Sequence, residues 1–174
     1  MSIRRKRLQW ALGSVGTGTF STVPSLLLLY FLTATLAVPM AYAVVAVFVP
    51  KAASLLIDPW IGRLSDRHAA RGRRPFLLVG AVTAGLTLAA LFGVPSAADP
   101  RLTASLVGAI YLASVLAFAI FAVPYIAMPP NIEPEPEAQL RLIGLRMVFV
   151  TIGIIVGGAL GPVLVDAAGG GTAG

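Results

Sequence analysis

The sequence predicts an all-α, polytopic membrane protein with about five transmembrane helices. Hydrophobic residues make up 57% of the 174 residues and charged residues only 11%, whereas a soluble domain needs roughly a quarter charged residues to keep its surface wetted. A hydrocarbon core of ~30 Å requires about 20 apolar residues of helix, and only helices satisfy a lipid-exposed backbone over that length. Five apolar blocks meet this requirement, at residues 9–33, 38–65, 75–94, 103–127 and 140–165.

The composition excludes several classes of function. With no cysteine, the chain has neither a disulfide framework nor a thiolate metal site, and its single histidine, His68, leaves little for metal ligation or a catalytic triad. We therefore expect no enzyme activity, no bound metal and no organic cofactor. A net charge of +6 would suggest a nucleic-acid partner in a soluble protein, but in this chain the positive charges mark the ends of apolar blocks.

The basic residues alternate between the joints and so predict an orientation. They cluster before the first block, between the second and third, and around the start of the fifth, whereas the alternate joints hold only Arg101. The positive-inside bias places the N-terminus in the cytoplasm of a cell whose inner membrane the protein spans several times. Residues 166–174 would then lie outside, and residues 169–174 have the composition of a flexible linker.

The first block carries a stripe of hydroxyl side chains with helical spacing. Ser14, Thr17, Ser21 and Ser25 follow one another at intervals that keep them on one face. Such a stripe either lines a polar path or forms hydrogen bonds to a neighbouring helix. On the first interpretation, Thr17 and Ser21 are candidate contacts for a solute.

The second block is the most informative, because it places charges at membrane depth. Lys51, Ser54, Asp58, Gly62 and Ser65 fall on a single helical face. A charge within the bilayer costs several kcal/mol and usually faces a cavity or a partner. Two interpretations remain open: a structural ion pair within the bundle, or a binding site for a cation or a substrate.

The third and fourth blocks differ in their polar content. The third has only Thr83 and Thr87 as polar interior residues and is expected to face lipid. The fourth presents Tyr111 and Tyr125 on one face. Aromatic rings on a cavity wall could stack on a sugar ring, and the same rings could equally be part of the core.

The fifth block contains Gly153, Gly157 and Gly161 at strict four-residue spacing. This spacing forms a groove that lets another helix backbone approach closely. Arg146, near the start of the block, could reach inward to a carboxylate or a substrate oxygen.

Two motifs flank the joint after the second block. Residues 58–67 read DPWIGRLSDR and residues 72–76 read GRRPF. The joint resembles the one between helices two and three of the major facilitator superfamily, in the form typical of the glycoside–pentoside–hexuronide:cation symporters. The stretches at 28–33, 123–125 and 141–147 resemble the same family, so the resemblance covers nearly the whole chain.

The resemblance implies roles for several residues. Asp58 matches one of two helix-two acids that bind the coupling cation, and Ser54 stands where the second acid would be. Gly18 and Ala122 stand where sodium-coupled members that resemble melibiose permease have sugar-binding acids. These departures put a melibiose-like substrate and a two-carboxylate sodium site in doubt. Arg146 matches an arginine near the sugar site.

The same resemblance assigns a gating role to the joint, where glycine permits close packing and the acid and arginines link two halves of the transporter. The matching residues are Gly62, Asp66, Arg67, Arg73 and Arg74. A complete relative has two six-helix bundles around a midplane site. This chain supplies about five helices of the first bundle, so we expect a truncated product, a fragment, or one chain of a split or oligomeric carrier.

The leading hypothesis is therefore a secondary transporter of a sugar or related small polar solute, coupled to H⁺ or Na⁺. Asp58 would bind the cation and Lys51 would tune its charge, with Ser54 beside them. A lone carboxylate in a poorly hydrated cavity favours protonation, which points to H⁺. The expected partners are the lipid bilayer, the small solute, and a second helical bundle or another copy. The alternative is a non-transporting accessory subunit that docks a partner on the Gly153–Gly157–Gly161 groove.

Overall fold

A computed structural model gives the fold and describes residues 3–67, 74–96 and 99–165, all helical or in joints between helices. Within these ranges, five helices are long and apolar enough to cross a membrane, which confirms the predicted all-α, multi-pass class. The predicted gating residue Arg73 and the tail from Asp166 onward lie outside the described residues. The elements are α1 (Ile3–Tyr30), the π-helix η1 (Phe31–Thr35), α2 (Met40–Arg67), α3 (Arg74–Phe92), α4 (Pro100–Ile126), α5 (Pro129–Ile132) and α6 (Pro136–Val165).

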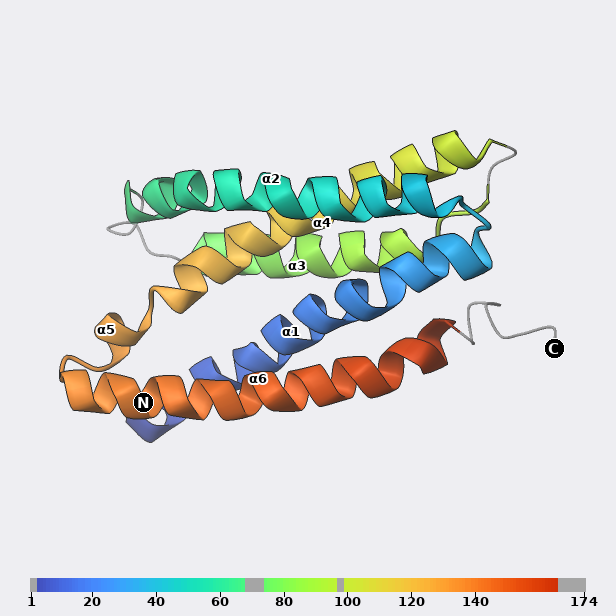
Figure 1. The fold of residues 1–174 in the computed structure, drawn as a ribbon. Helices are drawn as coiled ribbons and strands as arrows, with labels where there is room; N and C mark the ends of the chain where they lie inside the picture. The colour runs from blue at the N-terminus through green and yellow to red at the C-terminus, as the bar shows by residue number, and fades with distance from the viewer. Residues whose placement is uncertain (1–2, 68–73, 97–98, 166–174) are drawn as a thin grey trace.

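Successive long helices run in opposite directions through the bundle (Figure 1). Arg67 ends α2 and Arg74 begins α3 at the end of the bundle called here the basic end. Arg101 marks the opposite end, at the start of α4. The main packing pairs are α1 with α6 and α4 with both α2 and α3. Helices far apart in sequence therefore lie side by side.

Two local features at helix ends were not predicted from the sequence. The last turn of α1 widens into η1, where the Leu36 N–H donates to the Phe31 carbonyl at 3.0 Å. Ala37 then adopts a left-handed conformation with φ of 52°, which reverses the chain toward α2. After α4, the residues from Pro129 to Ile132 form the short helix α5. Neither feature has enough residues to produce a hydrophobic period.

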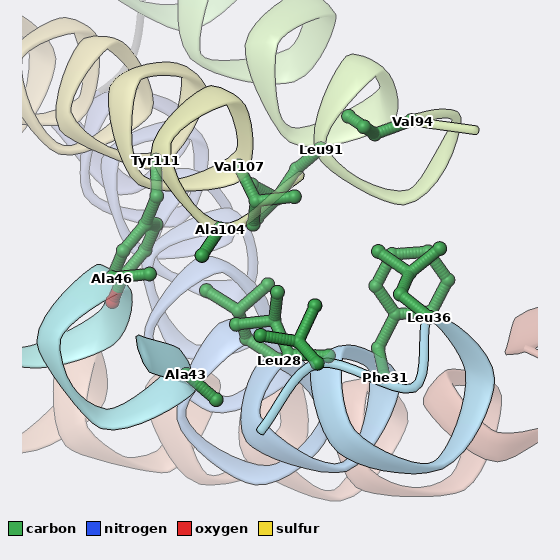
Figure 2. Close-up of a cluster of buried hydrophobic side chains, with 12 residues drawn as sticks. Leu28, Phe31, Leu36, Ala43, Ala46, Leu91, Val94, Ala104, Val107 and Tyr111 are labelled. Carbon is green, nitrogen blue, oxygen red and sulfur yellow. The ribbon is translucent and has the colours of Figure 1, made fainter. Parts of the chain in front are cut away.

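A large apolar cluster fills the Arg101 end of the bundle (Figure 2). Leu28 and Phe31 from the end of α1 and from η1 meet Leu91 of α3 and Val107 of α4. Figure 2 shows Ala43 and Ala46 of α2 on the other side of the same cluster. Burial of a leucine or phenylalanine side chain stabilises by about 1.5–3 kcal/mol, so this cluster holds the four helices together where the π-turn joins α1 to α2.

The contact between α1 and α6 brings the two backbones together through glycines. A methyl group added at Gly18 would overlap the Val150 carbonyl oxygen, and one added at Gly153 would overlap the Val15 carbonyl oxygen. The Thr19 hydroxyl also donates to the Gly153 carbonyl at 3.0 Å. Small residues and hydroxyl bonds of this kind are what hold helices together in a membrane.

This contact changes the interpretation of the glycine groove. Gly157 also packs on Thr19, whose Cα would lie 3.2 Å from an added methyl group. The side-chain surroundings of Gly161 are outside the described part of the chain. Because α1 already occupies the groove at Gly153 and Gly157, those two positions are not free to dock a separate partner as the accessory-subunit hypothesis required.

Candidate functional site

A cleft of about 280 Å³ opens between α1, α2 and α4, roughly halfway along the bundle. It brings together five of the residues predicted to bind a cation or a solute: Lys51, Ser54 and Asp58 from α2, Ser21 from α1 and Tyr111 from α4. The rest of the lining is apolar. It consists of Phe20, Val115, Phe118, Ala119, Ala122, Val123 and Ile126.

The polar wall of the cleft comes from α2. Lys51, Ser54 and Asp58 share a face because their spacing of three and four residues matches the helical turn. The Lys51 ammonium donates to the Ser25 hydroxyl of α1 at 3.1 Å. The Ser54 hydroxyl donates to the Lys51 carbonyl at 2.8 Å, so this side chain is satisfied within its own helix.

Asp58 is the half-buried acid of the cleft and has no hydrogen-bond or ion-pair partner among the described residues. No ion pair joins it to Lys51 within the same part of the chain. The structural ion pair between Lys51 and Asp58, one of the two interpretations left open by the sequence, is therefore not present in the described part of the structure. Two ionisable groups instead face one cleft, each available for a charged or polar ligand.

The opposite wall is aromatic. Phe20 of α1 and Phe118 of α4 stack with centroids 4.2 Å apart and planes 7° from parallel. Tyr111 is 3% exposed and also belongs to the apolar cluster of the Arg101 end. The cleft therefore combines flat apolar faces with the charged and hydroxyl groups of α2 and α1, the composition expected for a site that binds a small polar solute.

Three predicted solute contacts lie elsewhere. Thr17 is buried and donates to the Ser14 carbonyl at 2.8 Å, so its hydroxyl is used inside α1. Arg146 lies on α6, outside the lining of the cleft, and its Nε is buried without a hydrogen-bond partner among the described residues. The helical period placed Thr17 with Ser21, but of the two only Ser21 lines the cleft.

Tyr125, the third predicted solute contact outside the cleft, belongs to a cluster at the basic end. Its ring stacks on Trp10 at 5.2 Å, and its carbonyl accepts from the Trp10 indole N–H at 3.1 Å. Its hydroxyl donates to the Trp10 carbonyl and shares a hydrogen bond of 2.7 Å with the Ser14 hydroxyl. Tyr125 thus joins α4 to α1. This role could not be predicted from the sequence, because nothing distinguishes Trp10 from the other apolar residues of the first block.

The predicted gating residues surround the joint at the basic end. Gly62 lies at the α2–α4 contact, where an added methyl group would meet Val123 at an ordinary 3.7 Å. The packing of this bundle therefore does not itself require glycine there. Asp66 and Arg67 are exposed at the end of α2, and Arg74 is exposed at the start of α3.

An ion pair that the sequence did not predict links the start of α1 to the joint before α6 at the basic end. Arg7 of α1 and Glu133, in the joint before α6, approach to 2.5 Å, and the Glu133 side chain is 5% exposed. The hydrogen bond from Arg7 lowers the pKa of Glu133 below its ordinary value. The two residues are 126 positions apart in the sequence, so no local sequence pattern could predict their contact.

Comparison with known proteins identifies the class. Residues 9–174 match the family described as MFS/sugar transport protein, and the chain belongs to this family. Among curated proteins it is similar to the uncharacterized symporter sll1374 of Synechocystis, with 30% identity over 86% of this chain and 29% of that protein. It is also 24% identical to the inner membrane symporter YicJ of Escherichia coli, over 95% of this chain and 36% of that protein. No solved structure matches the chain significantly.

The chain thus spans about a third of the length of these relatives. The two positions where some members have sugar-binding acids differ in their surroundings. Ala122 lines the cleft that contains Asp58. Gly18 instead packs against the α6 backbone, so an acidic side chain could not be accommodated there without separating α1 from α6.

Proposed function

We propose that this chain forms one wall of a cation-coupled secondary transporter for a sugar or a related small polar solute. The observation that carries the proposal is the presence of Lys51 and Asp58 on one cleft at membrane depth, with no ion pair between them. Charges in such a position are costly unless they serve a ligand or a hydrated path. Membership of a sugar-transport family supports the same conclusion.

Asp58 is proposed to bind the coupling cation and Lys51 to act as its neighbouring positive charge. Ser54 stands beside them with a hydroxyl that already donates within its own helix. Only one carboxylate therefore faces the cleft among the described residues. Na⁺ sites generally combine several oxygen ligands, whereas a proton needs a single acceptor, so H⁺ is the proposed coupling ion.

The solute is proposed to lie against the stacked Phe20–Phe118 pair, with polar contacts to Ser21 and Tyr111. The cleft has about 280 Å³, below the range of roughly 300–1,000 Å³ typical of closed small-molecule sites. A second helical body, either a C-terminal continuation or another copy, is proposed to complete it. Rocking of the two bodies around the midplane would then expose the solute to alternate sides.

The gating joint is proposed to face that second body on the cytoplasmic side of the inner membrane. Its members are Gly62, Asp66, Arg67, Arg73 and Arg74. The four described members, all but Arg73, lie at the basic end, which is consistent with the positive-inside bias. No metal or organic cofactor is part of the proposal, and no catalytic chemistry is assigned to the chain.

The experiment compares Asp58→Asn with the unchanged protein in membrane vesicles that contain the assembled transporter. We expect Asp58→Asn to lose proton-driven uphill accumulation of a radiolabelled sugar while it keeps solute exchange without a gradient. Glu135→Gln removes an exposed carboxylate outside the cleft and should accumulate normally. Normal uphill accumulation by Asp58→Asn would show that the coupling role is wrong.

A further inference from the structure

A second hollow, of about 550 Å³, lies between α2 and α4 at the Arg101 end. Its walls are formed by Val45, Ala46 and Val49 of α2 and by Ala104, Gly108 and Leu112 of α4. None of these residues lines the solute cleft. We call this hollow the α2–α4 groove, and neither the charges of the cleft nor the proposed transport uses it.

The α2–α4 groove is apolar along its length. Val45 and Val49 are 58% and 59% exposed, and the hydroxyl of Ser105 donates to the Leu102 carbonyl at 2.9 Å, so it does not offer its proton to the groove. From Arg101 to Leu112 the helical rise spans ~16 Å, close to half of a hydrocarbon core of ~30 Å. The groove therefore has the depth of one leaflet.

Arg101 stands at the mouth of the groove with most of its donors free. Its Nε donates to the Tyr42 hydroxyl at 2.9 Å, and its guanidinium carbon lies 5.5 Å from the centre of the Tyr42 ring. The nearby Asp99 carboxylate accepts from the Arg101 backbone N–H at 2.8 Å. Within the described ranges, no acid pairs with the guanidinium, which leaves its two terminal NH₂ groups to bind an anion.

We propose that the α2–α4 groove binds a phospholipid, with the phosphate on Arg101 and one acyl chain along Val45, Val49 and Leu112. The order of groups along the groove, a cation at the mouth followed by one leaflet depth of apolar wall, is complementary to a phospholipid. Arginine is suited to the phosphate because its planar guanidinium can form two parallel hydrogen bonds. Tyr42 holds the guanidinium at the membrane interface, where tyrosine is favoured.

The test is native mass spectrometry of the full chain in detergent, titrated with palmitoyl-oleoyl phosphatidylglycerol. Palmitoyl-oleoyl glycerol, which has the same chains and no phosphate, is the matched probe. We expect Arg101→Gln to weaken phosphatidylglycerol binding about tenfold, because a charge-assisted hydrogen bond is lost. Arg141→Gln removes an exposed arginine elsewhere and should leave this binding unchanged. Ser105→Trp, which fills the groove, should abolish the specific binding of both probes.

Circular dichroism shows whether the Ser105→Trp chain keeps its helical content, and Arg101→Gln tests the proposal alone if it does not. Equal affinities of the unchanged chain and Arg101→Gln would overturn the proposal, as would equal losses in Arg101→Gln and Arg141→Gln. Equal binding of the two probes by the unchanged chain would contradict the role of the phosphate. A dimer that dissociates in Ser105→Trp would show that the groove binds a second copy instead.

Discussion

The α1–α6 contact and the cleft between α1, α2 and α4 use the same helix in opposite ways. On one face of α1, Gly18 lies directly against the α6 backbone and leaves no space even for a methyl group. On another, Ser21 lines a cleft in which Lys51 and Asp58 remain without an ion pair to each other. The α1–α6 contact fixes the position of α1, and that position determines which side chains of α1 face the cleft.

The difference shows that polar side chains in a membrane helix can be of two kinds: some form hydrogen bonds that pack helices together, and others face a cleft without a partner. Thr19 and Thr17 bond to backbone carbonyls at 3.0 Å and 2.8 Å, so these hydroxyls are part of the packing. Asp58 has no such partner in the described part of the chain. An unpaired charge at membrane depth is costly, so Asp58 does not contribute to the packing in the way that these hydroxyls do.

The largest expected effect is the loss of stability when the glycine contact between α1 and α6 is disrupted. Gly153→Leu would drive a side chain into the Val15 carbonyl, and overpacking of this kind costs typically 1–3 kcal/mol or more. We expect the variant to lose its thermal unfolding transition or to shift it strongly downward, as measured by circular dichroism in detergent. Gly158→Leu is the matched control, because no neighbouring atom lies within 4 Å of a Cβ added at Gly158. An unchanged transition in Gly153→Leu would contradict the close approach of α1.

The second prediction tests whether the cleft is wet. Because the chain has no cysteine, single-cysteine variants can be labelled without background. We expect Ser54→Cys to react with a water-soluble maleimide at least about tenfold faster than Ser114→Cys, since thiol reactivity follows exposure and ionisation. Ser54 lines the cleft, whereas Ser114 is fully buried. Equal labelling rates would remove the distinction between the two regions.

The smallest expected effect concerns the ion pair that closes the basic end. The folded protein holds the pKa of Glu133 below its ordinary value of 4.5, so the unfolded chain binds this proton more readily. The stabilisation by Glu133 is therefore complete above about pH 4.5 and is lost as the pH falls through the lower, folded-state pKa. We expect Glu133→Gln to unfold at a slightly lower temperature than the unchanged chain near pH 7, and the two to converge in acid. A constant difference at every pH would show that the pair does not stabilise through its charge.

The sequence was sufficient for the helices and for one wall of the cleft. Apolar blocks are set by bilayer thickness, so the five spans follow from hydropathy, and the stripe from Lys51 to Asp58 follows from the helical period within α2. Which residues of α1 and α4 meet that stripe depends on how three helices cross. Ser21 and Tyr111 were predicted to do so and line the cleft, while Tyr125 was predicted to do so and bonds to Trp10 instead.

The pairing of α1 with α6 has a consequence for biosynthesis. Of the five candidate spans, α1 has the lowest mean hydropathy, 1.4, and the largest buried share of its apolar window. Its glycine face matches α6, which begins at Pro136, about a hundred residues after α1 ends at Tyr30. At a synthesis rate of about 5–20 residues per second, the ribosome needs roughly 5–20 seconds to deliver that neighbour. During this interval α1, the least hydrophobic span, has no α6 to pack against. A nascent chain would therefore benefit from an insertase that shields α1 until α6 is made.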